Sequence, residues 1–211
     1  MDRRLIPIFP LNLVVFPGEI LKLHVFEPRY KQLVNEVLNN ETLFVIPPYF
    51  DHKVQKIGTL IRLQKLENLY PNGEMDIIVK GEAVVEIISF MKQAPGKLYG
   101  AGEIVSVDLD DELNPELSNQ IQKQLFELYR LIKSEKEFDD RPENITSFRI
   151  GHRVGFSIRQ EYEMLGMNSE VDRQLYILNH LDKIIPVIRE IEKTKDRIKQ
   201  NGHFRKTDVI D

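Results

Sequence analysis

Cysteine is absent from the 211 residues of this chain. Its absence excludes disulfide bonds, thiolate nucleophiles and cysteine-ligated zinc or iron–sulfur sites. It is compatible with the reducing cytoplasm, where we expect the protein to reside. Hydrophobic residues make up 42% of the chain and charged residues 29%, a balance typical of soluble globular proteins.

Long hydrophobic runs are also missing. No run reaches the roughly 18 apolar residues that a membrane helix needs, so no membrane association is expected. Arg3 and Arg4 precede an apolar stretch from Leu5 to Val15, an arrangement that superficially suggests a secretory signal. Pro7 and Pro10 interrupt this stretch, and no small-residue cleavage site follows it. We therefore predict an extended strand here.

The chain has no basic excess, since its formal net charge is −4. Proteins that bind nucleic acid neutralise phosphates with a surplus of Lys and Arg, so nucleic acid is not the expected partner. The phosphate-binding pattern G-x-x-x-x-G-K-[ST] and the nucleophile pattern G-x-S-x-G are both absent. We expect no enzymatic activity and no cofactor.

Metal binding is not expected either. No two of the five histidines have the i, i+4 spacing of a helical metal site. His152 and His180 could meet across packed helices, or they could simply line those helices.

Up to about residue 110, short apolar runs alternate with Gly, Pro and Asn. This pattern predicts a barrel of six or seven short strands rather than a parallel sheet. One helix interrupts the strands, opened by Pro28 and closed by Asn39 and Asn40. Gly81 permits a bend between two of the strands. The strands are expected at residues 5–16, 20–26, 43–46, 58–69, 75–80, 84–90 and 98–107.

The pattern beyond residue 110 is helical. Asn114 is expected to cap the first helix, with Pro115 in its first turn. Further helices are predicted near 145–154 and 158–165, then a long last helix that Pro186 must kink or break. The predicted organisation is a barrel subdomain (1–110), a helical bundle (111–200) and a loose tail (201–211), with a polar loop at 136–143. The fold class is α+β.

Several runs carry a resemblance to a known family. The segments LIPIFPL at 5–11 and VVFPG at 14–18 resemble the opening of the Lon N-terminal (substrate-binding) domain. The segment HVFEPRY at 24–30 is similar to the form found in stand-alone members. IGTL at 57–60 and VKGE at 79–82 resemble later segments of the domain, although Glu82 stands where the family often has arginine.

The resemblance continues more loosely in the helical half. The family pattern there is Lys-Gln-x-Leu-Leu-Glu, followed by Arg seven residues later. Here the matching segment is EYEMLG at 161–166, followed by Arg173. The leucine-type pair and the arginine are retained, whereas the Lys-Gln and the final Glu are not.

The resemblance implies a PUA-like pseudo-barrel followed by a helical bundle. In full-length Lon proteases this domain recruits substrates and helps to assemble the ring, and an ATPase and a Ser–Lys peptidase follow it. Because the chain lacks the ATPase motif and ends at Asp211, we expect a stand-alone, non-catalytic domain that binds polypeptides or partner proteins. The alternative that a PUA-like barrel implies is an RNA-binding module.

Three residues are candidates for binding, each with a structural alternative. Phe16, beside the Pro17–Gly18 turn, could be an exposed recognition residue or a core residue. Arg29 and Tyr30 could hydrogen-bond a peptide backbone. Alternatively, Arg29 could pair with Glu27 to fix the helix while Tyr30 packs inside.

Two features of the C-terminal region also leave alternatives open. The segment from Arg189 to Lys206 holds seven basic and three acidic residues. It could meet an acidic partner or nucleic acid, or form a solvated helix face. An apolar stripe comprising Val187, Ile188, Ile191 and Ile198 could pack on the chain's own helices or on a second copy, so the oligomeric state stays open.

Overall fold

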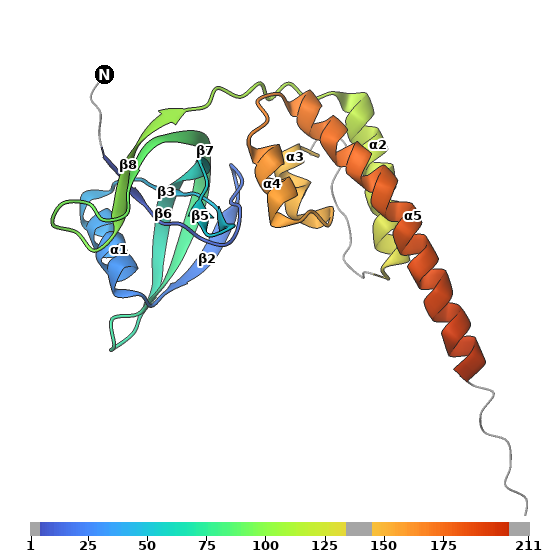
Figure 1. Cartoon of the computed structure of the whole chain (residues 1–211), viewed down its shortest axis with the longest axis horizontal. Helices are drawn as coiled ribbons and strands as arrows, with labels where there is room; N and C mark the ends of the chain where they lie inside the picture. The colour runs from blue at the N-terminus through green and yellow to red at the C-terminus, as the bar shows by residue number, and fades with distance from the viewer. Residues whose placement is uncertain (1–4, 134–144, 203–211) are drawn as a thin grey trace, which may run out of the picture. The chain divides into compact units, whose positions relative to one another are not determined.

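The computed structural model describes residues 5–133 and 145–202, which form two compact units (Figure 1). The barrel unit comprises residues 5–111 and 148–169, and the helical unit comprises 112–133, 145–147 and 170–202. The chain therefore crosses between the units more than once. Residues 148–169, which the sequence placed with the helical region, group with the barrel.

Strands dominate the barrel unit, as predicted. They form a six-stranded sheet in the order β2-β7-β6-β3-β1-β8, which an additional pairing between β7 and β8 closes into a pseudo-barrel. β1 and β3 are parallel, and the other pairings in the sheet are antiparallel. The strands are β1 (Ile6–Ile8), β2 (Ile20–Val25), β3 (Phe44–Ile46), β6 (Ile57–Leu69), β7 (Met75–Met91) and β8 (Gly100–Ser106).

β7 closes the barrel because it is long enough to pair with three strands. The sequence predicted two strands with a bend at Gly81, but one strand of 17 residues continues through this position. A Cβ atom at Gly81 would lie 2.3 Å from the carbonyl oxygen of Phe16. Glycine is therefore needed here because another segment of backbone passes too close for a side chain.

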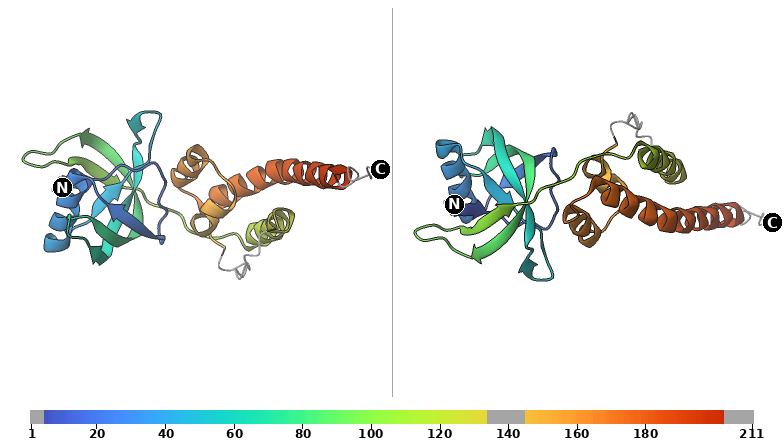
Figure 2. Two further views of the ribbon diagram at one scale, coloured as in Figure 1. Left: turned by 90° about the horizontal axis from the view of Figure 1, so that it is seen from below. Right: turned by 90° about the horizontal axis from the view of Figure 1, so that it is seen from above.

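α1 (Pro28–Asn40) packs on the barrel with one face buried (Figures 1 and 2). Pro28 occupies the first turn, as predicted, where a missing N–H removes no helical hydrogen bond. Tyr30, Leu33, Val34 and Val37 are buried among the core residues of the barrel. Burying each large apolar side chain contributes about 1.5–3 kcal/mol, so this face fixes α1 in place.

A short hairpin follows β3, which the sequence did not predict. β4 (Tyr49–Phe50) pairs with β5 (Lys53–Val54). Asp51 and His52 form the turn with φ angles of 53° and 59°, the left-handed conformation that such tight hairpins require. Two-residue strands bury too little to leave an alternating pattern in the sequence.

The helices of residues 148–169 contact the barrel strands. α3 (Ser147–Ile150) continues into a 3-10 helix (Gly151–Arg153), and α4 (Ile158–Leu165) follows. Ser157 opens α4 with a reciprocal capping box to Gln160. The Tyr162 hydroxyl accepts a hydrogen bond from the backbone N–H of Ile57 at the start of β6.

The helical unit contains α2 (Pro115–Leu131) and the long α5 (Glu170–Gly202), which pack against each other. The Asn114 side chain accepts hydrogen bonds from the first-turn N–H groups of α2, as the predicted cap requires. α5 is continuous through Pro186, so the expected break does not occur there. Proline removes one backbone hydrogen bond, which the rest of a long helix can tolerate.

α5 ends at Gly202, so Asn201 and Gly202, which the sequence placed at the start of the tail, belong to the helix. The rest of the predicted tail and the predicted polar loop at 136–143 lie outside the described residues.

Candidate functional site

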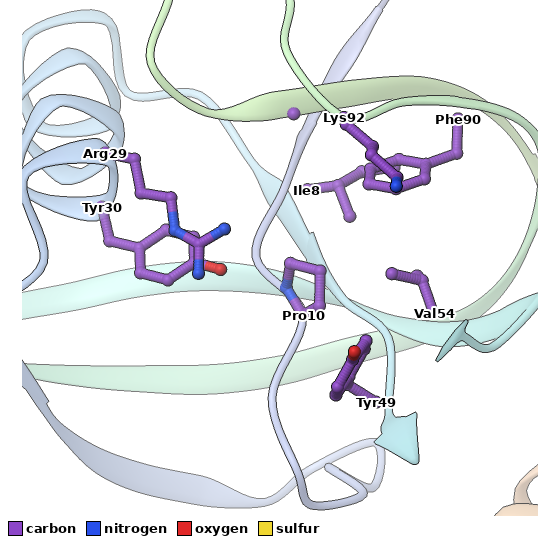
Figure 3. A pocket seen from close by; sticks show the side chains of 9 residues that line it. Ile8, Pro10, Arg29, Tyr30, Tyr49, Val54, Phe90 and Lys92 are labelled. Carbon is purple, nitrogen blue, oxygen red and sulfur yellow. The ribbon is translucent and has the colours of Figure 1, made fainter. Parts of the chain in front are cut away.

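A pocket of about 360 Å³ opens on the barrel unit beside the first turn of α1. Figure 3 shows Arg29 and Tyr30 entering it from α1 on one side, with Phe90 and Lys92 on the other. Pro10 and Tyr49 lie between these two walls. Nine residues line the pocket: Ile8, Pro10, Arg29, Tyr30, Tyr49, Val54, Phe90, Lys92 and Gly100. Apolar and aromatic walls with a few polar groups are typical of ligand-binding sites.

The α1 wall is rigid because its aromatic residue is packed from both faces. The ring of Tyr30 stacks on Phe9 with centroids 3.8 Å apart, and the guanidinium of Arg29 lies 4.4 Å from the Tyr30 ring centroid. Glu27 accepts hydrogen bonds from Nε and Nη2 of Arg29 at 2.9 and 2.8 Å. Tyr30 is only 5% exposed. Arg29 therefore pairs with Glu27, and Tyr30 packs inside, which is the structural alternative expected from the sequence. Both Arg29 and Tyr30 still line the pocket.

Burial also favours the neutral form of the Tyr30 hydroxyl. Burial raises the pKa of Tyr30, and the charge of nearby Glu27 adds to the rise against the opposing effect of Arg29. The hydroxyl therefore stays neutral at physiological pH and can both donate and accept a hydrogen bond.

Contacts from Glu36 and Gln32 hold the two walls of the pocket together. The Glu36 carboxylate, on α1, accepts hydrogen bonds from Lys97 Nζ at 2.7 Å and from the Tyr99 hydroxyl at 2.6 Å. The side chain of Gln32 accepts from the backbone N–H of Leu98 at 2.8 Å. These partners belong to the β7–β8 connection, which carries Lys92. Because the Lys97 and Tyr99 hydrogen bonds favour the ionised carboxylate, they lower the pKa of Glu36.

Phe16 lies elsewhere and is fully buried. Its ring stacks on Phe148 with centroids 5.4 Å apart and contacts His152 at 4.6 Å. Gly18, in the adjacent turn, has a φ of +82°, which glycine adopts without strain. With no exposed side-chain surface, Phe16 is a core residue that joins the barrel to the segment containing α3.

Sequence reasoning missed the polar cluster around His152. Its Nδ1 lies 2.7 Å from a carboxylate oxygen of Glu161, and its Nε2 lies 3.1 Å from Glu19. Burial alone lowers the pKa of His152, but hydrogen bonds and charges from the two glutamates outweigh it and raise this pKa to about 9. Both ring nitrogens are engaged by carboxylates, so the cluster is structural. No sequence pattern indicates it, because its members come from three separate segments.

The family model described as the ATP-dependent protease La (LON) substrate-binding domain matches residues 5–183. The chain belongs to this family. A search of curated proteins finds no match.

Two solved structures share the fold of this Lon-type domain. A Lon N-terminal domain protein from Xanthomonas campestris aligns with a TM-score of 0.65 and 21% identity, covering 83% of this chain and 98% of that one. The N-terminal domain of the Lon protease from the Mycobacterium avium complex gives a TM-score of 0.62 and 12% identity, covering 85% and 99%. At these identities the likeness concerns the fold alone.

Two of the three positions where this Lon-type chain departs from the helical motif of its family bond to the barrel. Glu161 bonds to His152, and the ring of Tyr162 packs edge-on against Phe50 with centroids 5.5 Å apart. A side chain at Gly166 would meet Ile57 at 3.0 Å. Glu161 therefore contacts the 3-10 helix, whereas Tyr162 and Gly166 belong to the contact with the strands.

The retained arginine of the motif has a buried role. Arg173 is fully buried and donates from Nε to Ser147 at 2.9 Å and to Glu170 at 3.0 Å. The Glu170 carboxylate also accepts the backbone N–H and hydroxyl of Ser147. This network fixes the start of α5 to Ser147, the first residue of α3.

α5 keeps an apolar stripe on its surface. Val187, Ile191 and Ile198 are exposed in this chain. Of the basic side chains nearby, Lys193 pairs with Glu190 and Lys195 with Glu192 along the helix, and Arg189 pairs with Glu127 of α2. Across residues 5–133 and 145–202, no helix is long and apolar enough to cross a membrane.

Proposed function

We propose that this Lon-type domain binds segments of other polypeptides, and that the pocket beside α1 receives an apolar side chain of the bound segment. The family to which the chain belongs is a substrate-binding domain. The observation that supports the site is the apolar and aromatic pocket wall, held rigid by the Phe9–Tyr30 stack. A preorganised wall binds without the cost of ordering it.

In this proposal the domain holds its client without cleaving it. None of the nine described lining residues is a serine, threonine, histidine or carboxylate, so the pocket lacks the serine–histidine, serine–lysine and paired-carboxylate arrangements that cleave peptides. Binding depends instead on apolar contact. The hydroxyls of Tyr30 and Tyr49 and the cationic side chains of Arg29 and Lys92 are available to orient the client.

Binding of an unfolded protein tests the proposal. The probe is fluorescently labelled lactalbumin that has been reduced and carbamidomethylated, so that it stays unfolded. Tyr49→Ala removes an aromatic wall from the pocket. Tyr70→Ala is the matched control, because both tyrosines are 41% exposed and Tyr70 does not line the pocket.

We expect Tyr49→Ala to weaken binding about tenfold, as for an aromatic residue at the centre of an interface, and Tyr70→Ala to change it by less than about twofold. If the unfolded probe does not bind the original protein, polypeptide binding is wrong. If both variants weaken binding equally, the pocket is not the binding site.

A further inference from the structure

Both charged side chains that line the pocket are cations. Arg29 and Lys92 are its only ionisable lining residues apart from the two tyrosines, and no carboxylate is among the nine described residues that line it. Figure 3 shows these cations on opposite sides, with Ile8 and Pro10 between them. An apolar cavity edged by cations is complementary to a ligand that joins an apolar group to a carboxylate.

Lys92 is the uncompensated cation of the pair. Its side chain is exposed, and it makes no ion pair with any residue that the structure describes. Arg29 is partly neutralised, because two of its N–H groups point at one oxygen of Glu27. Its remaining N–H groups are available, and stacking on Tyr30 holds the guanidinium in position.

We infer that the pocket binds the C-terminal end of a client polypeptide, with the last side chain in the apolar cavity and the terminal carboxylate at Lys92, assisted by Arg29. The inference rests on the proposed function and names the part of the client that is bound. A C-terminal residue carries both required groups on one Cα atom, so a single residue fills the pocket and meets the cation.

The size of the pocket favours a chain end over a chain interior. About 360 Å³ lies near the lower limit of roughly 300–1,000 Å³ for ligand pockets, so the space suits one or two residues. An internal segment would need room for the chain to continue in both directions. An internal acidic residue would also supply its carboxylate and its apolar neighbour from two different side chains, which face apart along an extended segment.

Matched peptides test the inference directly. The probes are short N-terminally fluorescein-labelled peptides of Gly and Ser that end in Leu or Phe. Each is made as the free acid and as the C-terminal amide, which removes the charge and leaves the side chain unchanged. A third form carries an internal Asp beside Leu and an amidated end. Affinity is measured by fluorescence anisotropy on the whole chain.

We expect the free acid to bind about tenfold more tightly than the amide, the scale of a charge-assisted hydrogen bond. Lys92→Gln should bring the two affinities close together, and Lys92→Arg should restore the difference. Lys123→Gln, which removes an exposed lysine from α2 in the other unit, should leave the difference intact.

The remaining outcomes separate this inference from the proposed function. Equal binding of acid and amide, a preference for internal Asp, or an acid preference that survives Lys92→Gln would overturn recognition of the chain end at this pocket while polypeptide binding stands. The same conclusion follows if unfolded lactalbumin binds but no short peptide does. If neither probe binds, both proposals fail.

Discussion

His152 and Glu19 lie 133 positions apart in the sequence, yet Nε2 of the histidine is 3.1 Å from a carboxylate oxygen of the glutamate. The same oxygen accepts the backbone N–H of Phe16 at 2.9 Å. On its other side the imidazole bonds to Glu161 of α4. One ring therefore joins the β1–β2 connection to α4, which explains why residues 148–169 group with the barrel.

This contact predicts a loss of stability at alkaline pH. The pKa of His152 is about 9 in the folded protein, against an ordinary value of 6.5. The stabilisation is therefore complete below about pH 6.5, declines as the pH rises, and is lost above about pH 9. Because the side chain is 38% exposed, solvent screens the contact, and we expect His152→Asn to cost about 1 kcal/mol at neutral pH.

The measurement is the free energy of unfolding in urea at several pH values between about 6.5 and 9. His152→Asn should flatten the alkaline decline. His52→Asn is the control, because His52 is exposed in the β4–β5 turn with a φ of 59°, which asparagine tolerates. An unchanged decline in His152→Asn would show that other groups cause it.

Gly81→Ala should destabilise the barrel by about 2–3 kcal/mol. Its Cβ would lie 2.3 Å from the Phe16 carbonyl oxygen. The two backbones would have to separate, which breaks the hydrogen bonds that Gly81 shares with Gly18 and Glu19 at 2.9 Å each. Thermal or urea unfolding measures the loss.

Gly73→Ala is the control for that substitution. No atom lies within 4 Å of the Cβ position at Gly73, but φ there is +75°. Backbone strain alone should cost about 1 kcal/mol. If Gly81→Ala were no more destabilising than Gly73→Ala, close approach of the backbone would not be the reason for glycine at position 81.

Arg173→Met should cost about 3–5 kcal/mol, because it leaves the buried Glu170 carboxylate without its cationic partner. Arg189→Met on the same helix removes an exposed ion pair with Glu127 and should cost less than about 1 kcal/mol. Arg173→Lys keeps the charge and should lie between them. Urea unfolding followed by circular dichroism measures all three; equal losses for Arg173→Met and Arg189→Met would contradict a stabilising role for the buried network.

Glu36→Gln should weaken peptide binding about threefold. Glu36 does not line the pocket, but its substitution loosens the contact between the two pocket walls.

The Glu36 pKa lies below its ordinary 4.5 when the protein is folded. Its contribution to stability is thus present above about pH 4.5 and lost as the pH falls through the lowered value. The stability difference between Glu36→Gln and the original protein should shrink over this acidic range.

Glu86→Gln, on an exposed position of β7, is the matched control and should leave peptide affinity unchanged. Equal peptide affinity in Glu36→Gln and the original protein would indicate that the β7–β8 connection keeps its position without this carboxylate.

Local features of the sequence correctly predicted the elements that depend on nearby residues. Pro28 and Asn114 marked helix starts, because the first turn of a helix tolerates proline and needs a side-chain cap. The β4–β5 hairpin and the continuity of β7 were not predicted. Pairing partners far along the chain decide both, and short or uninterrupted strands leave no separate local pattern.

The amino-acid sequence by itself therefore determined the family, the order of strands before helices and the starts of α1 and α2. These properties follow from side chains acting on their own neighbourhood of backbone. Only the tertiary structure decided that Phe16 is buried, that Arg29 faces Lys92 across a pocket, and that His152 joins α4 to the barrel. Each of these relationships joins distant segments, and closing the barrel around a shared core is the physical event that brings those segments together.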